Sequence, residues 1–171
     1  MSISLYQASV PVFVRGLTTM SKVLRKGEEH ARAAGADPAS LVEARLAPDM
    51  LTLAGQVQRA SDTSKLAIER ITGTPSPKLD DTETTFAELY ARIDKTIAYI
   101  DSVKQAQLDG LDDKTIELKL RDFAPTFSAS TYLFTFALPN FFFHVTTAYD
   151  ILRHKGVPLS KMDYLRLKDE R

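Results

Sequence analysis

Apolar side chains recur every three or four residues along several long stretches of this chain, which is the spacing of one face of an α-helix. The clearest stripe comprises Phe86, Leu89, Ile93, Ile97, Ile100 and Val103. A similar stripe near the N-terminus comprises Phe13, Leu17, Met20 and Leu24. This pattern predicts a mainly helical protein in which each long helix buries one face against its neighbours.

Glycine and capping residues predict where these helices end and begin. Gly35, Gly73 and Gly156 each follow a helical stretch and are followed within three residues by a proline. Glycine adopts the left-handed conformation that ends many helices, and proline cannot continue one. Two pairs, Asp80 with Glu83 and Thr85 with Glu88, have the spacing of a capping box. The segment GTPSPKLDD, residues 73–81, is rich in proline and glycine and predicts a linker.

Four long helices are expected, at about residues 5–34, from near 48 to just before 73, from 81–85 onward, and at about 130–154. Between the third and the fourth, Ile116, Leu118 and Leu120 alternate with charged residues, which is the period of a half-buried strand. Residues 124–130 are its expected hairpin partner. We therefore predict an all-α fold, a single domain over residues 1–171 that forms a four-helix bundle with a small β-hairpin between helices 3 and 4.

Composition excludes several classes of function. The chain has 22 Lys plus Arg and 22 Asp plus Glu residues, so its formal net charge is zero and no nucleic-acid partner is expected. The absence of cysteine excludes disulfides, thiolate nucleophiles and cysteine-ligated zinc. The apolar segment 131–152 contains Pro139, Asn140 and Asp150, so a buried helix is favoured over a membrane span. With no targeting segment visible, a cytoplasmic protein with no membrane partner is expected.

The expected fourth helix is apolar around much of its circumference. Phe141, Phe142 and Phe143 are consecutive, so their side chains point about 100° apart around the helix axis. Such a helix needs cover on several sides, and its three neighbours in a bundle supply only part of it. We expect the rest to come from the hairpin or from a second subunit, which makes a homodimer the expected assembly.

A line of polar residues runs through the same helix. Asn140, His144 and Thr147 share one face through i+4 and i+3 spacing, and Pro139 leaves the carbonyl of Thr135 without its helical partner. Buried polar groups cost about 1–3 kcal/mol each unless they are hydrogen-bonded. Two interpretations stay open: these groups satisfy one another in the core, or they form a site for a ligand.

Facing helices offer few further groups for chemistry. In the second helix, Gln58 and Asp62 share a face, and Asp62 is interpreted as a carboxylate ligand, a group that orients His144, or half of a surface pair with Lys65. His30 is interpreted as a solvated residue, and His154 as a partner of Asp150 at the negative end of the helix dipole. No Walker A loop, GxGxxG, HExxH or GxSxG motif occurs.

Two segments resemble a known family. The segment ALPNFFFHVTTAYDILRHKGVPLSKMDYL, residues 137–165, resembles the C-terminal signature of a bacterial domain family of unknown function in the DinB/YfiT-like superfamily. The segment APDMLTLAGQVQRASDTSK, residues 47–65, is similar to the second-helix motif of that family. The resemblance implies a DinB-like four-helix bundle, often dimeric. It also points to relatives that bind a divalent metal through three histidines, some of them thiol-dependent transferases or isomerases.

This chain departs from the metal-binding pattern that the resemblance implies. His144 matches the first histidine of the fourth helix, but Ala148 stands at the i+4 position and the second helix has no histidine. The three-histidine site is therefore expected to be absent, and a divalent metal stays open as a cofactor without support from ligand spacing. Two hypotheses follow: a small-molecule pocket around His144, Asn140 and Tyr149, with transfer chemistry if it is an enzyme, or a non-catalytic dimeric binding or stress-associated module.

Overall fold

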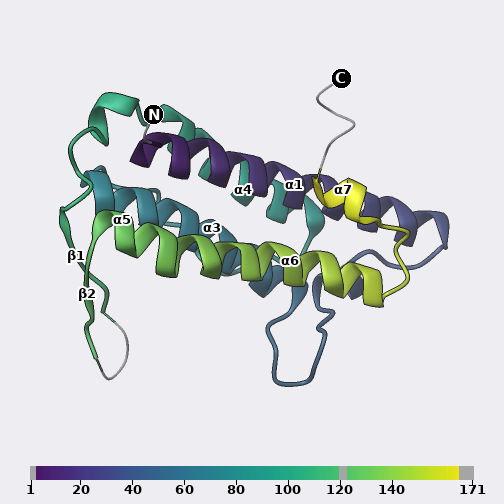
Figure 1. The fold of residues 1–171 in the computed structure, drawn as a ribbon. Helices are drawn as coiled ribbons and strands as arrows, with labels where there is room; N and C mark the ends of the chain where they lie inside the picture. The colour runs from purple at the N-terminus through teal and green to yellow at the C-terminus, as the bar shows by residue number, and fades with distance from the viewer. Residues whose placement is uncertain (1–2, 120–122, 166–171) are drawn as a thin grey trace.

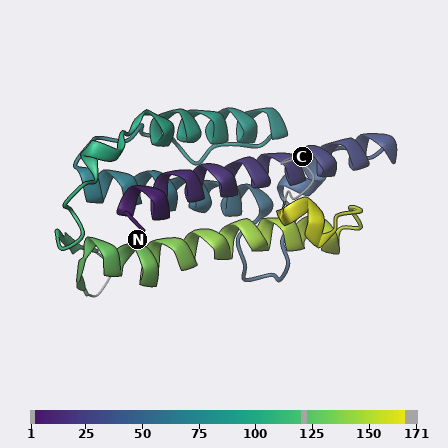
Figure 2. The same cartoon turned by 45° about the horizontal axis from the view of Figure 1, so that its top comes forward.

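Four long helices lie side by side along the molecule (Figures 1 and 2). The computed structural model describes residues 3–119 and 123–165. The long helices are α1 (Leu5–Ala33), α3 (Leu53–Thr72), α4 (Phe86–Ser102) and α6 (Leu138–His154). The short elements are α2 (Ala39–Val42), a 3-10 turn (Gln105–Gln107), β1 (Thr115–Glu117), β2 (Thr126–Ser128), α5 (Ala129–Tyr132), a π-helical turn (Leu133–Ala137) and α7 (Lys161–Leu165). The predicted four-helix bundle with a small hairpin is confirmed.

Side-chain caps determine where the long helices begin. Thr85 and Glu88 form the predicted capping box at the start of α4, and Thr52 accepts a hydrogen bond from the backbone of Gly55 at the start of α3. The expectation that the second long helix starts near Pro48 is wrong by one turn, because Thr52 caps the helix and the residues before it form a loop. Glu83 does not act in a capping box, because its carboxylate bonds Arg92 and Gln58 instead.

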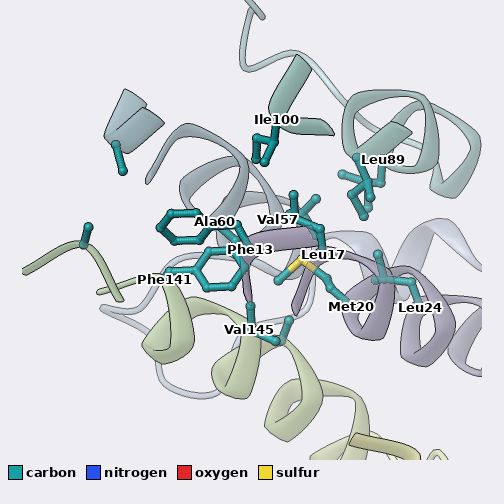
Figure 3. Close-up of a cluster of buried hydrophobic side chains, with 14 of the residues drawn as sticks. Phe13, Leu17, Met20, Leu24, Val57, Ala60, Leu89, Ile100, Phe141 and Val145 are labelled. Carbon is teal, nitrogen blue, oxygen red and sulfur yellow. The ribbon is translucent and has the colours of Figure 1, made fainter. Parts of the chain in front are cut away.

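The core lies where the apolar stripes of the four helices meet. Figure 3 shows Phe13, Leu17 and Met20 of α1 among side chains of α3, α4 and α6. The rings of Phe13 and Phe141 meet edge to face, with centroids 5.0 Å apart. Gly16 allows α1 and α6 to approach here, since a Cβ at this position would lie 2.4 Å from a ring carbon of Phe141.

The predicted fourth helix is continuous in space but contains one widened turn. Residues 129–154 follow one path, and the turn over residues 133–137 is π-helical, directly before Pro139 in the first turn of α6. Proline lacks an N–H and crowds the carbonyl four residues earlier, which explains the wider turn. Among the described residues, no helix has the length and apolarity needed to cross a membrane.

The β-hairpin projects from one end of the bundle (Figure 1). Strands β1 and β2 are antiparallel, with Ile116 opposite Phe127, and Phe127 packs against the ring of Tyr132 in α5. Leu120, the last apolar residue of the predicted alternation, lies outside the described residues. The described part of the hairpin packs beside α5, so it leaves the middle of α6 uncovered.

Candidate functional site

Hydrogen bonds between α6 and α3 pair the predicted polar line with side chains of the facing helix. His144 Nδ1 lies 2.7 Å from Gln56 Oε1, and Asn140 donates to Thr63 Oγ1 over 2.8 Å. Thr147 bonds its own helix, through its hydroxyl and the carbonyl of Phe143 at 2.7 Å. The three side chains therefore do not bond one another, as the first interpretation expected, but bond other groups of the protein. Within the described residues, no hydrogen bond accounts for the second ring nitrogen of His144, Nε2.

The amide of Gln56 determines the tautomer of His144. Gln56 Nε2 donates to the backbone carbonyl of Leu51 over 3.3 Å, so its Oε1 is the atom that faces His144. An amide oxygen only accepts hydrogen bonds, so the proton of the neutral imidazole must sit on Nδ1. The remaining nitrogen, Nε2, then carries a lone pair and acts as an acceptor.

Burial keeps this imidazole neutral. His144 is 9% exposed, and Gln56 is 1% exposed. Burial, followed by the positive charge of Arg59, lowers the pKa of His144 to about 4. At neutral pH the ring is therefore uncharged, and within the described part of the chain no group donates a hydrogen bond to Nε2.

A short loop and an aromatic ring flank the site. The loop of residues 44–53 closes on itself through a 2.8 Å hydrogen bond from the backbone of Leu53 to the carbonyl of Ala44. Its Leu51 carbonyl holds Gln56, and the Leu51 side chain is exposed. On the other side, the ring of Phe143 packs edge to face against His144, with centroids 5.2 Å apart, and is itself 57% exposed. His144 therefore lies at the edge of the bundle, between a loop and an exposed aromatic ring.

Three of the predicted site residues contact other parts of the protein. Gln58 donates to Glu83 over 2.9 Å, and Asp62 accepts from Arg92 over 2.9 Å, so these two side chains face the linker before α4 and α4 itself. The interpretation of Asp62 as a group that orients His144 is therefore corrected, because Gln56 does so. Tyr149 packs against the ring of Tyr164 in α7. Of the predicted set, His144 and Asn140 share the α3–α6 interface.

A cluster of charged side chains around the buried Arg92 lies on the opposite side of α3, and of this cluster the sequence analysis predicted only the pair of Asp62 with Lys65. The side chain of Arg92 is 1% exposed and bonds Asp62, Asp81 and Glu83 at 2.9–3.0 Å, as well as the carbonyl of Asp80. Lys65, 6% exposed, pairs with Asp62 at 3.2 Å, and Arg59 pairs with Asp81. The sequence feature that could have indicated this cluster is Arg92 itself, which directly precedes Ile93 of the apolar stripe of α4. We call these six charged residues the Arg92 cluster: Arg59, Asp62, Lys65, Asp81, Glu83 and Arg92.

The Arg92 cluster holds the linker between α3 and α4 in place. Residues 80–83 of this linker supply the carbonyl and two of the carboxylates that surround Arg92. Burial raises the pKa of Glu83, but hydrogen bonds from Arg92 and Gln58 outweigh it and leave the pKa below its usual value. The linker between α3 and α4, which was predicted from composition, is thus held against the bundle by hydrogen bonds and ion pairs to Arg92.

The residues around His144 do not fit the metal that the DinB-like resemblance implies. Ala148, one turn after His144, is fully buried and offers only a methyl group. Gln56, on the facing helix, already uses its amide oxygen on Nδ1 of His144. Across the described residues, no group of three His, Cys, Asp or Glu side chains is placed to hold an ion. A protein metal site needs several such ligands around one point, and one imidazole does not supply them.

Comparisons with known proteins agree with the fold. The family model described as a domain of unknown function, DUF1993, matches residues 5–165. This chain belongs to the DUF1993 family. The DUF1993 chain is also similar to the crystal structure of a DinB family member protein from Shewanella denitrificans, with a TM-score of 0.87. The two are 36% identical, over 94% of this chain and 91% of the other. The expected DinB-like domain of unknown function is confirmed, and curated proteins gave no match.

Proposed function

We propose that this DUF1993 protein binds a small molecule through Nε2 of His144, without a metal ion. The observation that carries the proposal is the orientation of the Gln56 amide, which leaves Nε2 as an acceptor in a neutral ring. Among the described residues, Nε2 is not one of the buried side-chain atoms that lack a partner, so solvent reaches it, and a donor on a ligand would replace water at this position.

The surroundings of His144 indicate the chemistry of such a ligand. Nε2 requires an O–H or N–H donor, and the neighbouring Phe143 ring favours an apolar or aromatic body next to that donor. Asn140, one helical turn before His144, is the other predicted ligand-binding residue on this interface, and it already bonds Thr63. The contacts of Gln58, Asp62 and Tyr149 lend no support to their predicted roles in binding the ligand.

Binding is better supported than catalysis at this site. A general base works best when its pKa lies near the working pH, whereas the pKa of His144 is lowered to about 4. Such a ring is a good hydrogen-bond acceptor but a weak base at neutral pH. A transferase-like reaction with a divalent metal lacks the ligands, as described above.

The test is a nitrogen NMR experiment on the histidine rings, with phenol as the probe. Phenol supplies one O–H donor and an aromatic ring. We expect the spectrum to show the Nδ1–H tautomer for His144, and saturable phenol binding to move its Nε2 resonance. Absence of any phenol-dependent change at Nε2 up to the solubility limit would overturn the proposal.

A matched pair of variants on α3 sharpens this test. Gln56→Met removes the acceptor for Nδ1, so we expect the proton to move to Nε2 and phenol to lose its binding site. Gln58→Met makes the same change two residues later, on a side chain that faces Glu83, and is expected to retain phenol binding. Equal loss in both variants would contradict the role of Gln56.

The exposed face of the helix from α5 to α6 supports a second candidate, a homodimeric binding module. No charged residue occurs from Ala129 to Tyr149. Phe134 and Phe143 are 54% and 57% exposed on this helix, and the described hairpin does not cover Phe143. Two such rings expose roughly 200 Å² of apolar surface on an uncharged stretch of helix, which a second copy of the chain would bury.

We infer that a second copy of the chain covers this face. Light scattering of the purified protein is expected to give the mass of a dimer. Phe143→Asp is expected to give monomers, whereas Leu46→Asp, which also places a charge on an exposed apolar residue but away from α6, is expected to leave the dimer intact. A monomeric wild-type protein would exclude the dimer while leaving the His144 proposal standing.

A further inference from the structure

A groove of about 410 Å³ lies between α1, α6 and α7, on a different face of α6 from His144. Its walls are mainly apolar and include Pro11 and Val12 of α1, and Phe142 and Val145 of α6. Gly16 lies in the wall and has no side chain to fill the space, while its close contact with Phe141 holds the two helices together below the groove. The groove is therefore a consequence of the glycine that the close contact between α1 and Phe141 requires at position 16.

The third wall, α7, is held by contacts to both neighbouring helices. Asp163 pairs with Lys26 of α1 at 2.5 Å, and the Leu165 carbonyl accepts a hydrogen bond from Arg15 at 2.7 Å. The hydroxyl of Tyr164 lies 3.1 Å from that of Thr146 in α6. Figures 1 and 2 show α7 lying against α1 beside the C-terminal half of α6. The groove therefore has three fixed walls rather than two.

We propose that this groove is a binding site for an uncharged, mainly apolar small molecule that carries a hydrogen-bond donor. Its volume lies within the range of about 300–1,000 Å³ that is typical of small-molecule sites, and apolar walls with few polar groups are typical of them as well. Arg15, the one charged residue among those lining the groove, already bonds the carbonyl of Leu165. Gln7 is one of the lining residues, and its carbonyl lacks the usual helical donor because Pro11 has no N–H.

Larger occupants fit the groove less well. A stable interface with a second copy of the chain buries about 800 Å² on each partner, far more than the short stretch of α1, α6 and α7 around this hollow offers. The last six residues of the chain, RLKDER, are all charged except Leu167, so their chemistry does not match apolar walls. A small neutral ligand is the occupant that the lining favours.

The test uses N-phenyl-1-naphthylamine, a neutral apolar fluorophore with one N–H donor, titrated into the full chain. We expect enhanced, saturable emission with one probe per chain. Phe142→Ala removes one wall and is expected to weaken binding about ten-fold, equivalent to about 1.4 kcal/mol, while Phe134→Ala on the same helix changes it less than about two-fold. Val12→Trp is expected to fill the groove and abolish binding.

Phe142→Ala in α6 and Phe134→Ala in the preceding π-helical turn both change exposed rings, so the folded state is expected to survive in each, and circular dichroism checks it. If Val12→Trp fails to fold, the comparison of Phe142→Ala with Phe134→Ala still decides the matter. Unsaturable binding by the wild type, or equal affinity in Phe142→Ala and Phe134→Ala, would overturn the proposal. The His144 site shares none of these lining residues, so either outcome leaves the first proposed function to its own test.

Discussion

Helix α3 presents two different kinds of polar contact on its two sides. Toward α6 it uses neutral pairs, Gln56 with His144 and Thr63 with Asn140. Toward α4 and the linker it uses the Arg92 cluster, in which three cations meet three carboxylates. The charged side joins three segments of chain into one network, whereas the neutral side joins two helices pairwise and leaves an acceptor open at His144.

The difference follows from the cost of burying charge. A buried guanidinium is tolerated only when its donors meet carboxylates and carbonyls, so the Arg92 cluster must be nearly complete to exist. A neutral imidazole or amide costs less to bury, and one open acceptor is tolerated at the edge of the bundle. We therefore expect the charged side of α3 to stabilise the folded state, whereas the neutral side is able to bind a ligand.

The largest effect is expected from Arg92→Met. Removing the buried guanidinium leaves Glu83 without its cation, while Asp62 keeps Lys65 and Asp81 keeps Arg59, and the free energy of unfolding should fall by about 3–5 kcal/mol. Chemical denaturation followed by circular dichroism measures this change. Lys95→Met removes an exposed cation three residues later on α4 and is expected to change stability by less than about 0.5 kcal/mol. Equal effects of the two variants would contradict the importance of the cluster.

The next largest effect is expected from acid. The pKa of His144 is about 4 in the folded protein and about 6.5 in the unfolded chain, so between these values the unfolded chain binds more protons. Stability contributed by the neutral ring is thus complete above about pH 6.5 and is lost as the pH falls toward 4, by about 3 kcal/mol in total. Unfolding curves across this range measure it.

His144→Gln provides the comparison for the pH experiment. It removes the imidazole at the α3–α6 interface, whose pKa is lowered to about 4. We expect its stability to vary much less than that of the wild type between pH 6.5 and 4. Glu83, in the Arg92 cluster, also has a lowered pKa, so its contribution is lost at lower pH, below 4.5. If the free energy of unfolding of the wild type did not change with pH above 4.5, the neutral state of the His144 ring would be contradicted.

Gln56→Leu is expected to cost about 2 kcal/mol, because it leaves Nδ1–H of His144 buried without an acceptor. The ring can recover part of this cost by moving its proton to Nε2, where the edge of the bundle is more open. Nitrogen chemical shifts of His144 report the tautomer directly, and urea denaturation reports the stability. A variant that retains the Nδ1–H form would show that Gln56 is not the group that sets it.

The smallest effect is expected from Asn140→Ala, which removes one neutral hydrogen bond and should cost about 1 kcal/mol. A double-mutant cycle with Thr63→Ala isolates the coupling between the two side chains. We expect a coupling of about 0.5–1 kcal/mol that is insensitive to salt, unlike charge pairs exposed to solvent. A coupling near zero would show that the pair contributes nothing to the α3–α6 interface.

Much of the fold was predictable because it depends on local patterns. The stripe from Phe86 to Val103, the capping box of Thr85 and Glu88, and the glycine at the end of α3 each determine structure within a few residues. The start of α3 was misplaced because Pro48 resembles a helix start, whereas the side chain of Thr52 makes the cap. The π-helical turn before Pro139 was not predicted as such, although the break in hydrogen bonding at this proline was.

The sequence by itself determined the helices and the polar line on α6, since these follow from residue type and spacing along one helix. Only the tertiary structure decided which side chains of α3 face His144 and Asn140 of the polar line. Gln56 and Gln58 are two positions apart on α3, yet one orients His144 and the other bonds Glu83. The rotation of one helix against another is set by packing of the whole core, including the close approach at Gly16, and no local pattern encodes it.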